Sequence, residues 1–296
     1  MPVIDHRGVL KGLKVKEAMR RQVIRLAGQA DLEQAIRYAI KYKVNALLVE
    51  GEDQQALGVV SKTDLMGAYY AGLPLTTPAE AVMVGPPLFC QGEDSLESAL
   101  DIMQSHRVHR LYVEGDLPRQ AAGVLAYPDI LGLLYRYCHR CDRARHRSAG
   151  AMGPSLKDYL KVREVMTPGI LTFQEGDSLA RVMEGLAANR IAAVLIRGND
   201  GAPAGVVSKT DLILAYRHGV PVTEPARTVM NSPVRACEQD DFLDAALRQM
   251  IFADVHRLFV YKDRPPDLVG VLALSDVARF RCGTCRACVS SRIGPG

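Results

Sequence analysis

The sequence lacks the features that mark membrane proteins, exported proteins and most enzymes. No apolar run approaches the roughly 20 residues that a membrane-spanning helix needs, and the first residues contain no apolar core like that of a signal peptide. The chain also has no Gly-x-x-x-x-Gly-Lys-Ser/Thr phosphate loop, no Gly-x-Gly-x-x-Gly motif and no nucleophile–base pair. These absences predict a cytoplasmic protein that is not an enzyme and does not enter a membrane.

The charge is small and gives little support to a nucleic-acid partner. The net charge of +4 over 296 residues does not require a polyanion. No helix-turn-helix and no base-stacking platform is evident, so nucleic-acid binding through a basic linker is the weakest hypothesis. The composition, 48% hydrophobic and 24% charged, is that of a globular protein with two domains of ordinary size.

The most informative feature is a tandem duplication. Gly58–Leu65 and Gly205–Leu212 both read GVVSKTDL, and their offset (205 − 58 = 147) holds over most of the chain. Val108–Leu111 and Val255–Leu258, both VHRL, obey it as well. One half of the chain is therefore a unit, and any property shared by the halves occurs at two symmetry-related places.

Each half divides again into two shorter units. In the first unit Leu32, Ala35, Ile36 and Ala39 fall at helical spacing, and two apolar runs of strand length follow. The predicted order is strand, helix, strand, strand, helix. Units of about 55–60 residues are marginally stable alone, so we expect them to pair. The units are residues 14–70, 78–136, 160–217 and 225–281.

The ends of these units resemble a known family. Each unit has a Gly-apolar-apolar-x-x-x-Asp segment, and these segments are Gly58–Asp64, Gly123–Asp129, Gly205–Asp211 and Gly270–Asp276. They are similar to the Gly-apolar-apolar-Ser/Thr-x-x-Asp motif of CBS domains, although Ala126 and Ala273 replace the hydroxyl residue in the even units. The resemblance implies an α/β (α+β) fold of four β-α-β-β-α units, paired into two modules that form a pseudo-twofold disc. The disc is expected either within one chain or in a homodimer.

The repeat also sets the predicted domain boundaries. Residues 1–141 form the first pair and end in Cys-x-x-Cys, and residues 158–289 form the second pair and end in Cys-x-x-Cys-x-x-Cys. Residues 142–157 are predicted to be a basic, flexible linker, and residues 290–296 a disordered tail.

The family resemblance implies binding of adenosine-containing ligands in clefts between paired units. Ser61 is expected to cap a helix whose first N–H groups favour a phosphate, and Asp64 would then face ribose hydroxyls. A capping box without a ligand is the alternative explanation of the same motif. The candidate nucleotide-binding residues are Ser61, Lys62, Thr63, Asp64, Ser208, Lys209, Thr210, Asp211, Arg110, Arg257, Asp129 and Asp276.

The even units differ from the odd units in these candidates. Because they lack the hydroxyl, we expect their sites, at Asp129 and Asp276, to be weak or empty. At the positions of Arg110 and Arg257, members of the family often have a basic residue that reaches toward the phosphate of the ligand. The alternative interpretation is that these arginines are surface charges at the start of a strand. Asn45-Ala46 and Ala192-Ala193 occupy the matching places in the odd units, and we hypothesise that their small side chains leave room for an adenine ring.

The seven cysteines follow the duplication. Cys90 and Cys237 are predicted to be small buried core residues. The other five follow the closing helices, where four thiolates meeting near the pseudo-twofold axis would suit zinc or an iron–sulfur cluster. A redox-reactive pair without metal, or an accident of duplication, remains as an alternative. The candidate metal ligands are Cys138, Cys141, Cys282, Cys285 and Cys288.

Two functions are therefore weighed. The first is a non-catalytic regulatory protein that binds AMP, ADP, ATP or S-adenosylmethionine and signals to an unidentified protein partner. The alternative is a zinc- or iron–sulfur-dependent redox sensor that uses the duplicated cysteines on the same scaffold.

Overall fold

The computed structural model describes residues 12–140 and 160–279 and contains the four predicted units. Each unit has the order strand, helix, strand, strand, helix, which confirms the predicted fold class. The first comprises β1 (Arg25–Ala27), α2 (Leu32–Lys41), β2 (Ala46–Glu50), β3 (Ala56–Ser61) and α3 (Lys62–Tyr70), after the short helix α1 (Val15–Ala18). The second comprises β4 (Phe89–Cys90), α4 (Leu96–Ser105), β5 (Arg110–Glu114), β6 (Ala121–Ala126) and α5 (Tyr127–Arg140).

The second half repeats these elements. The third unit comprises β8 (Thr172–Gln174), α7 (Leu179–Ala188), β9 (Ala193–Arg197), β10 (Pro203–Ser208) and α8 (Lys209–Arg217), preceded by β7 (Thr167–Pro168). The fourth comprises β11 (Ala236–Glu238), α9 (Leu243–Phe252), β12 (Arg257–Tyr261), β13 (Leu268–Ala273) and α10 (Leu274–Arg279). Helices α2 and α7 start and end at positions separated by the same offset as the GVVSKTDL copies, so the duplication is structural as well as sequential.

Local sequence explains how each unit forms. Asp31 caps α2, because its Oδ1 accepts a hydrogen bond from the N–H of Gln34 at 2.8 Å. The helix then buries the predicted apolar face, with Leu32 and Ile36 fully buried. In each unit the first strand pairs in parallel with the second, which pairs antiparallel with the third.

The motif glycines hold the two units of a module together. A Cβ added to Gly58 would lie 2.6 Å from the Sδ of Met83, which belongs to the segment leading into the second unit. In the second module, a Cβ added to Gly205 would lie 2.9 Å from the Sδ of Met230. Only glycine permits this close approach, so the motif glycine is explained by the pairing of units.

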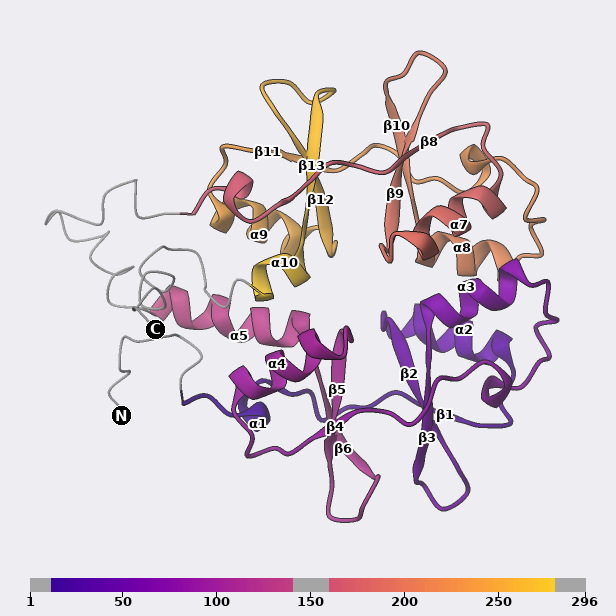
Figure 1. Cartoon of the computed structure of the whole chain (residues 1–296), viewed down its shortest axis with the longest axis vertical. Coiled ribbons are helices and arrows are strands. Elements are labelled where there is room, and N and C mark those ends of the chain that lie inside the picture. The colour runs from indigo at the N-terminus through magenta and orange to yellow at the C-terminus, as the bar shows by residue number, and fades with distance from the viewer. Residues whose placement is uncertain (1–11, 141–159, 280–296) are drawn as a thin grey trace, which may run out of the picture.

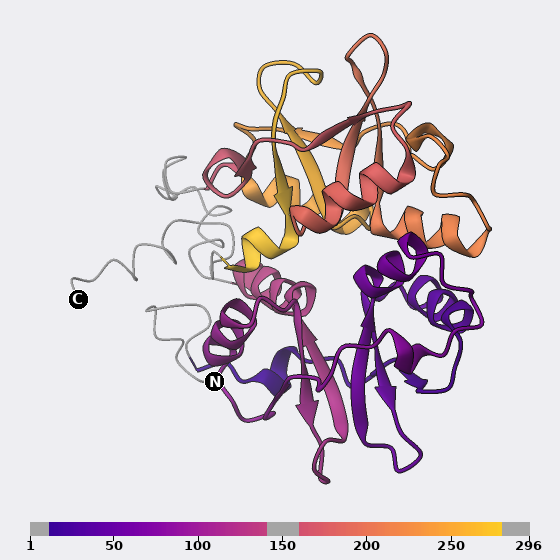
Figure 2. The same cartoon turned by 45° about the vertical axis from the view of Figure 1, so that its right-hand side comes forward.

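The two modules pack through their helices within this one chain. Helices α2 and α3 share a hydrophobic core with α7 and α8, and α5 lies beside α10 (Figure 1). The rings of Tyr69 and Tyr216 stack across this interface with centroids 5.1 Å apart. The hydroxyl of Tyr69 donates to the carbonyl of Val220 at 2.6 Å. Figure 2 shows the same face-to-face arrangement of the halves from a second direction.

The four units thus surround a common centre (Figure 1). Among the described residues, no helix has both the length and the apolar character needed to cross a membrane.

Candidate functional site

The Ser-x-x-Asp motif of the first unit forms a capping box. Ser61 is the N-cap of α3, and its Oγ accepts from the N–H groups of Thr63 and Asp64 at 3.2 and 3.4 Å. The carboxylate Oδ2 of Asp64 accepts from the Ser61 N–H at 2.7 Å and from the Ser61 hydroxyl at 2.6 Å. The capping interpretation of the motif is therefore realised, and it engages only one carboxylate oxygen of Asp64.

The third unit repeats this box with one additional contact. The Oδ2 of Asp211 accepts from the N–H and the hydroxyl of Ser208, both at 2.7 Å. Its Oδ1 also accepts from the side-chain amide of Asn231 at 2.7 Å. Val84 stands at the place of Asn231 in the first module, so the two copies of the motif differ in how fully the carboxylate is bonded.

The middle residues of the two motifs meet across the module interface. The ammonium group of Lys62 donates to the hydroxyl of Thr210 at 2.8 Å. Reciprocally, Lys209 donates to Thr63 at 2.8 Å. The duplicated SKTD sequence therefore places two lysines and two threonines at the centre of the molecule, next to the pseudo-twofold axis.

Further basic residues approach this centre from the even units. Burial, together with the charge of Arg110, lowers the pKa of Lys62 to about 8, and the charge of Asp211 opposes these two effects. Burial and the charge of Arg257 likewise lower the pKa of Lys209. We call Lys62, Arg110, Lys209, His256 and Arg257 the central cluster.

Positive charge in the central cluster exceeds what its neighbours neutralise. Burial lowers the pKa of His256, and the charges of Lys62 and Arg257 lower it further. Burial also lowers the pKa of Arg257, against the opposing charge of Asp276. Burial disfavours the charged form of every member of the central cluster, and all of them except Arg257 are also disfavoured by a neighbouring cation. Such crowding of positive charge favours the binding of an anion.

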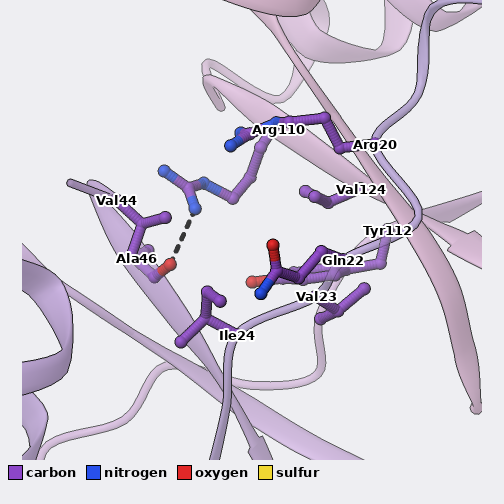
Figure 3. Close-up of a pocket in the computed structure, with 9 residues that line it drawn as sticks. All are labelled: Arg20, Gln22, Val23, Ile24, Val44, Ala46, Arg110, Tyr112 and Val124. Atoms are coloured by element: carbon purple, nitrogen blue, oxygen red, sulfur yellow. Dashed lines mark hydrogen bonds between the residues drawn. The ribbon is translucent and has the colours of Figure 1, made fainter. Parts of the chain in front are cut away.

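The central cluster is connected to a cleft in the first module (Figure 3). The partly buried guanidinium group of Arg110 points into this cleft and donates from Nη1 to the backbone carbonyl of Ala46 at 2.8 Å. The remaining space is about 10 Å³, enough for about one water molecule. The cleft is lined by Arg20, Gln22, Val23, Ile24, Val44, Ala46, Arg110, Tyr112 and Val124.

Two polar groups of this cleft were not predicted from the sequence. The hydroxyl of Tyr112 is buried beside the Arg110 guanidinium, and no hydrogen bond of standard geometry joins it to another of the described residues. Arg20 forms an ion pair with Asp129, with 2.8 Å between Nε and Oδ1. Asp129 also accepts from the N–H of Ala126 at 2.9 Å. The repeat gave no signal for these residues, because the offset relates Tyr112 to Phe259 and Arg20 to Thr167, which differ from them in chemistry.

The predicted residues are thus divided between two places. The Ser61 and Asp64 motif does not line the cleft of Figure 3, whereas Arg110 does and Asp129 is joined to it through Arg20. Ala46 lines the cleft as well. The cleft lies between the first and second units, and the motif aspartate beside it, Asp129, is that of the even unit, whose site the sequence predicts to be weak or empty.

The second module has a different set of side chains at the equivalent positions. Phe259 stands at the place of Tyr112, and Thr167 at the place of Arg20. Asp276 still accepts from the N–H of Ala273 at 2.9 Å, as Asp129 does from Ala126. The two modules are therefore not chemically equivalent, although their backbones are.

The cysteines fall into two groups. Cys90 and Cys237 are buried, as predicted, and burial raises the pKa of each thiol to about 12. Cys141, Cys282, Cys285 and Cys288 lie outside the described residues, as do the predicted linker and tail. Cys138 lies within α5, but its side chain is not described. The residues that the structure describes contain no group of three or more metal-ligating side chains.

Comparison with known families identifies the four units. A family model described as CBS domain matches residues 15–71, 79–136, 162–218 and 226–283. This chain belongs to the CBS domain family. The match confirms the resemblance seen in the four Gly-apolar-apolar-x-x-x-Asp segments and accounts for two tandem CBS pairs.

Several relatives of this CBS-domain protein come from archaea. It is 22% identical over 189 residues to an uncharacterized 33.4 kDa protein in the ribosomal RNA operon of Thermofilum pendens, covering 62% of this chain and 58% of the relative. Less than two thirds of that relative is therefore matched. Protein MJ1225 of Methanocaldococcus jannaschii is 22% identical over 204 residues, covering 67% of this chain and 68% of the relative.

Solved structures share the whole fold. The crystal structure of MJ1225 superposes with a TM-score of 0.75 at 14% sequence identity, covering 90% of this chain and 99% of that chain. A conserved protein from Pyrococcus horikoshii gives a TM-score of 0.58 at 17% identity, covering 91% and 100%. At these identities the comparison establishes the arrangement of the four units and not the ligand.

Proposed function

We propose that this CBS-domain protein is a non-catalytic regulatory protein that binds an adenosine-containing ligand between paired units. The observation that carries the proposal is the position of Arg110. Its side chain fills the cleft of the first module, and its charge belongs to the central cluster. One movement of this side chain would open a space for a base and bring a cation to its phosphate.

The cleft offers the groups that an adenine ring needs. When Arg110 leaves, the carbonyl of Ala46 loses its donor and can accept from the exocyclic amine of adenine. The buried hydroxyl of Tyr112, which lies beside Arg110, can then bond to a ring nitrogen. Val23, Ile24 and Val44 supply apolar contact for the ring faces.

The central cluster selects among adenosine-containing ligands. Phosphate groups would stabilise its crowded cations, whereas the positive sulfonium of S-adenosylmethionine would add to the repulsion. We therefore favour AMP, ADP or ATP. Asp129 is the candidate for ribose contact in the first cleft, and Asp64 and Asp211 are the candidates in the clefts of the odd units.

Regulation would follow from the shared position of the cluster between the modules. Lys62 and Lys209 each contact the opposite module, so a phosphate that draws either lysine away alters the module interface. The changed orientation of the modules would be read by a protein partner or by a second copy of the chain. No step of this proposal requires catalysis or a metal.

Calorimetric titration of the full chain with AMP, ADP, ATP and S-adenosylmethionine tests the proposal. We expect binding of at least one of the three nucleotides that is stronger than binding of S-adenosylmethionine. Tyr112→Phe should weaken AMP binding about fivefold, since one hydrogen bond of about 1 kcal/mol is lost. Phe89→Leu, which alters the ring beside Tyr112 but no cleft-lining group, is the matched control. Absence of heat with every ligand at millimolar concentration would refute the proposal.

A further inference from the structure

A cavity of about 360 Å³ opens between the second and third units, separate from the cleft of Figure 3. It is lined by Gln104 and Arg107 near the end of α4, by His109 before β5 and by Arg190 after α7. All four residues are exposed, and none is acidic. Its volume lies within the range of small-molecule sites, about 300–1,000 Å³.

The charges of this cavity are not balanced within the described part of the chain. Neither Arg107 nor Arg190 forms an ion pair there. Two guanidinium groups from different modules therefore face one cavity without a carboxylate between them. A concave surface lined by charge of one sign concentrates ions of the opposite sign.

The symmetry-related place in the molecule is built differently. The repeat offset relates Arg190 to Lys43 and Arg107 to Asp254. Lys43 and Asp254 form an ion pair that joins the first and fourth units. The bond to Lys43 lowers the pKa of Asp254. One place is thus closed by opposite charges, whereas the other holds two like charges and a cavity.

The backbone supports a role for these four side chains. Lys43, Arg107, Arg190 and Asp254 each follow the first helix of their unit and have φ between 51° and 54°. Glycine is the usual residue at this left-handed position after a helix. Every unit instead retains a charged side chain there, directed to one of two equivalent junctions between the modules.

We propose that the cavity between Arg107 and Arg190 binds a multivalent phosphate anion. The planar guanidinium groups match phosphate oxygens in bidentate geometry, and His109 and Gln104 supply further N–H donors. The anion bridges the modules here as the Lys43–Asp254 pair does at the other junction. Anion binding at this site does not depend on whether the cleft binds an adenosine-containing ligand. The phosphate chemistry is shared by free pyrophosphate and by the terminal phosphates of a nucleotide, and the experiment separates these sources.

The test is calorimetric titration of the full chain with inorganic pyrophosphate at constant low ionic strength. Arg107→Asp copies the arrangement at Asp254 and lets the introduced carboxylate pair with Arg190. It should weaken pyrophosphate binding at least about tenfold while leaving AMP binding unchanged. Arg107→Lys, which keeps the charge but loses the bidentate geometry, should weaken binding less than Arg107→Asp does. Asp254→Arg removes the ion pair at the other junction and should add a second pyrophosphate site. Thermal melting establishes that each variant is folded.

The outcomes are distinct. Unchanged pyrophosphate binding by Arg107→Asp, or no binding by the wild-type chain, would overturn the proposal. A loss of ATP affinity in Arg107→Asp with AMP unaffected would support the site and assign it to terminal phosphates. A loss for pyrophosphate alone would support it and assign it to the free anion. If the wild-type chain binds pyrophosphate through Arg107 but binds no adenosine compound, the function proposed for the cleft fails and this site stands.

Discussion

Replacing Lys62 by methionine should stabilise the ligand-free protein at neutral pH. Burial, with the charge of Arg110, lowers the pKa of Lys62 from its ordinary value of 10.5 to about 8. At 1.36 kcal/mol per pKa unit, this shift corresponds to about 3 kcal/mol by which folding disfavours the charged lysine. The substitution also removes the hydrogen bond to Thr210, which contributes about 1 kcal/mol. The expected net gain is therefore about 2 kcal/mol at pH 7.

The pH dependence has a definite sign. Because the folded-state pKa of Lys62 is depressed, its unfavourable effect is fully present below pH 8. This unfavourable effect decreases as pH rises from about 8 to 10.5. In that interval Lys62 has lost its proton in the folded chain but still holds it in the unfolded chain, so folding becomes more favourable as pH rises. The wild-type protein should gain stability over this interval, and the advantage of Lys62→Met should be nearly lost by pH 10.

Urea denaturation of both proteins at pH 7 and pH 10 measures this effect. Lys209→Met, at the symmetry-related position, should act in the same direction, since the pKa of Lys209 is also lowered. Lys262→Met, at an exposed position, should change stability by less than about 0.5 kcal/mol. If Lys62→Met is less stable than the wild-type protein at pH 7, the cationic crowding inferred for the central cluster is wrong.

Two other substitutions test how the units and modules are joined. Gly58→Ala should destabilise the protein by about 1–3 kcal/mol, because its Cβ would meet Met83, whereas Gly67→Ala in α3 has open space and should stabilise it by about 1 kcal/mol. Equal effects of the two alanines in urea denaturation would contradict the packing role of Gly58. Tyr69→Phe removes a hydroxyl that donates to the other module and should lower the free energy of unfolding by about 1 kcal/mol. An unchanged denaturation midpoint would show that this bond does not hold the modules together.

Much of the fold could be predicted because it depends on local patterns that occur four times. The helical spacing of Leu32 and Ile36, and the glycine and aspartate of each motif, are visible in one unit and checked by the other three. The burial of Cys90 and Cys237 followed from the same comparison and is confirmed.

The candidate site was less predictable because it is formed by residues from different units. The contact between Lys62 and Thr210 depends on how the modules pack, which no spacing within a unit specifies. The role of Tyr112 depends on the burial of its hydroxyl beside Arg110, and its position looks like an ordinary apolar strand in the sequence. Conversely, Ser61 and Asp64 were expected as ligand groups but also form a complete capping box, which the motif alone could not distinguish.

The central claim is that Arg110 leaves the cleft when a nucleotide binds. A crystal structure of the full chain with AMP measures this most directly. The decisive distance is that between the Nη1 of Arg110 and the carbonyl oxygen of Ala46, which is 2.8 Å in the structure described above. We predict that this hydrogen bond is broken, that adenine occupies the space beside Tyr112, and that the guanidinium group contacts the phosphate. A bound AMP with the Arg110–Ala46 hydrogen bond intact would contradict the account.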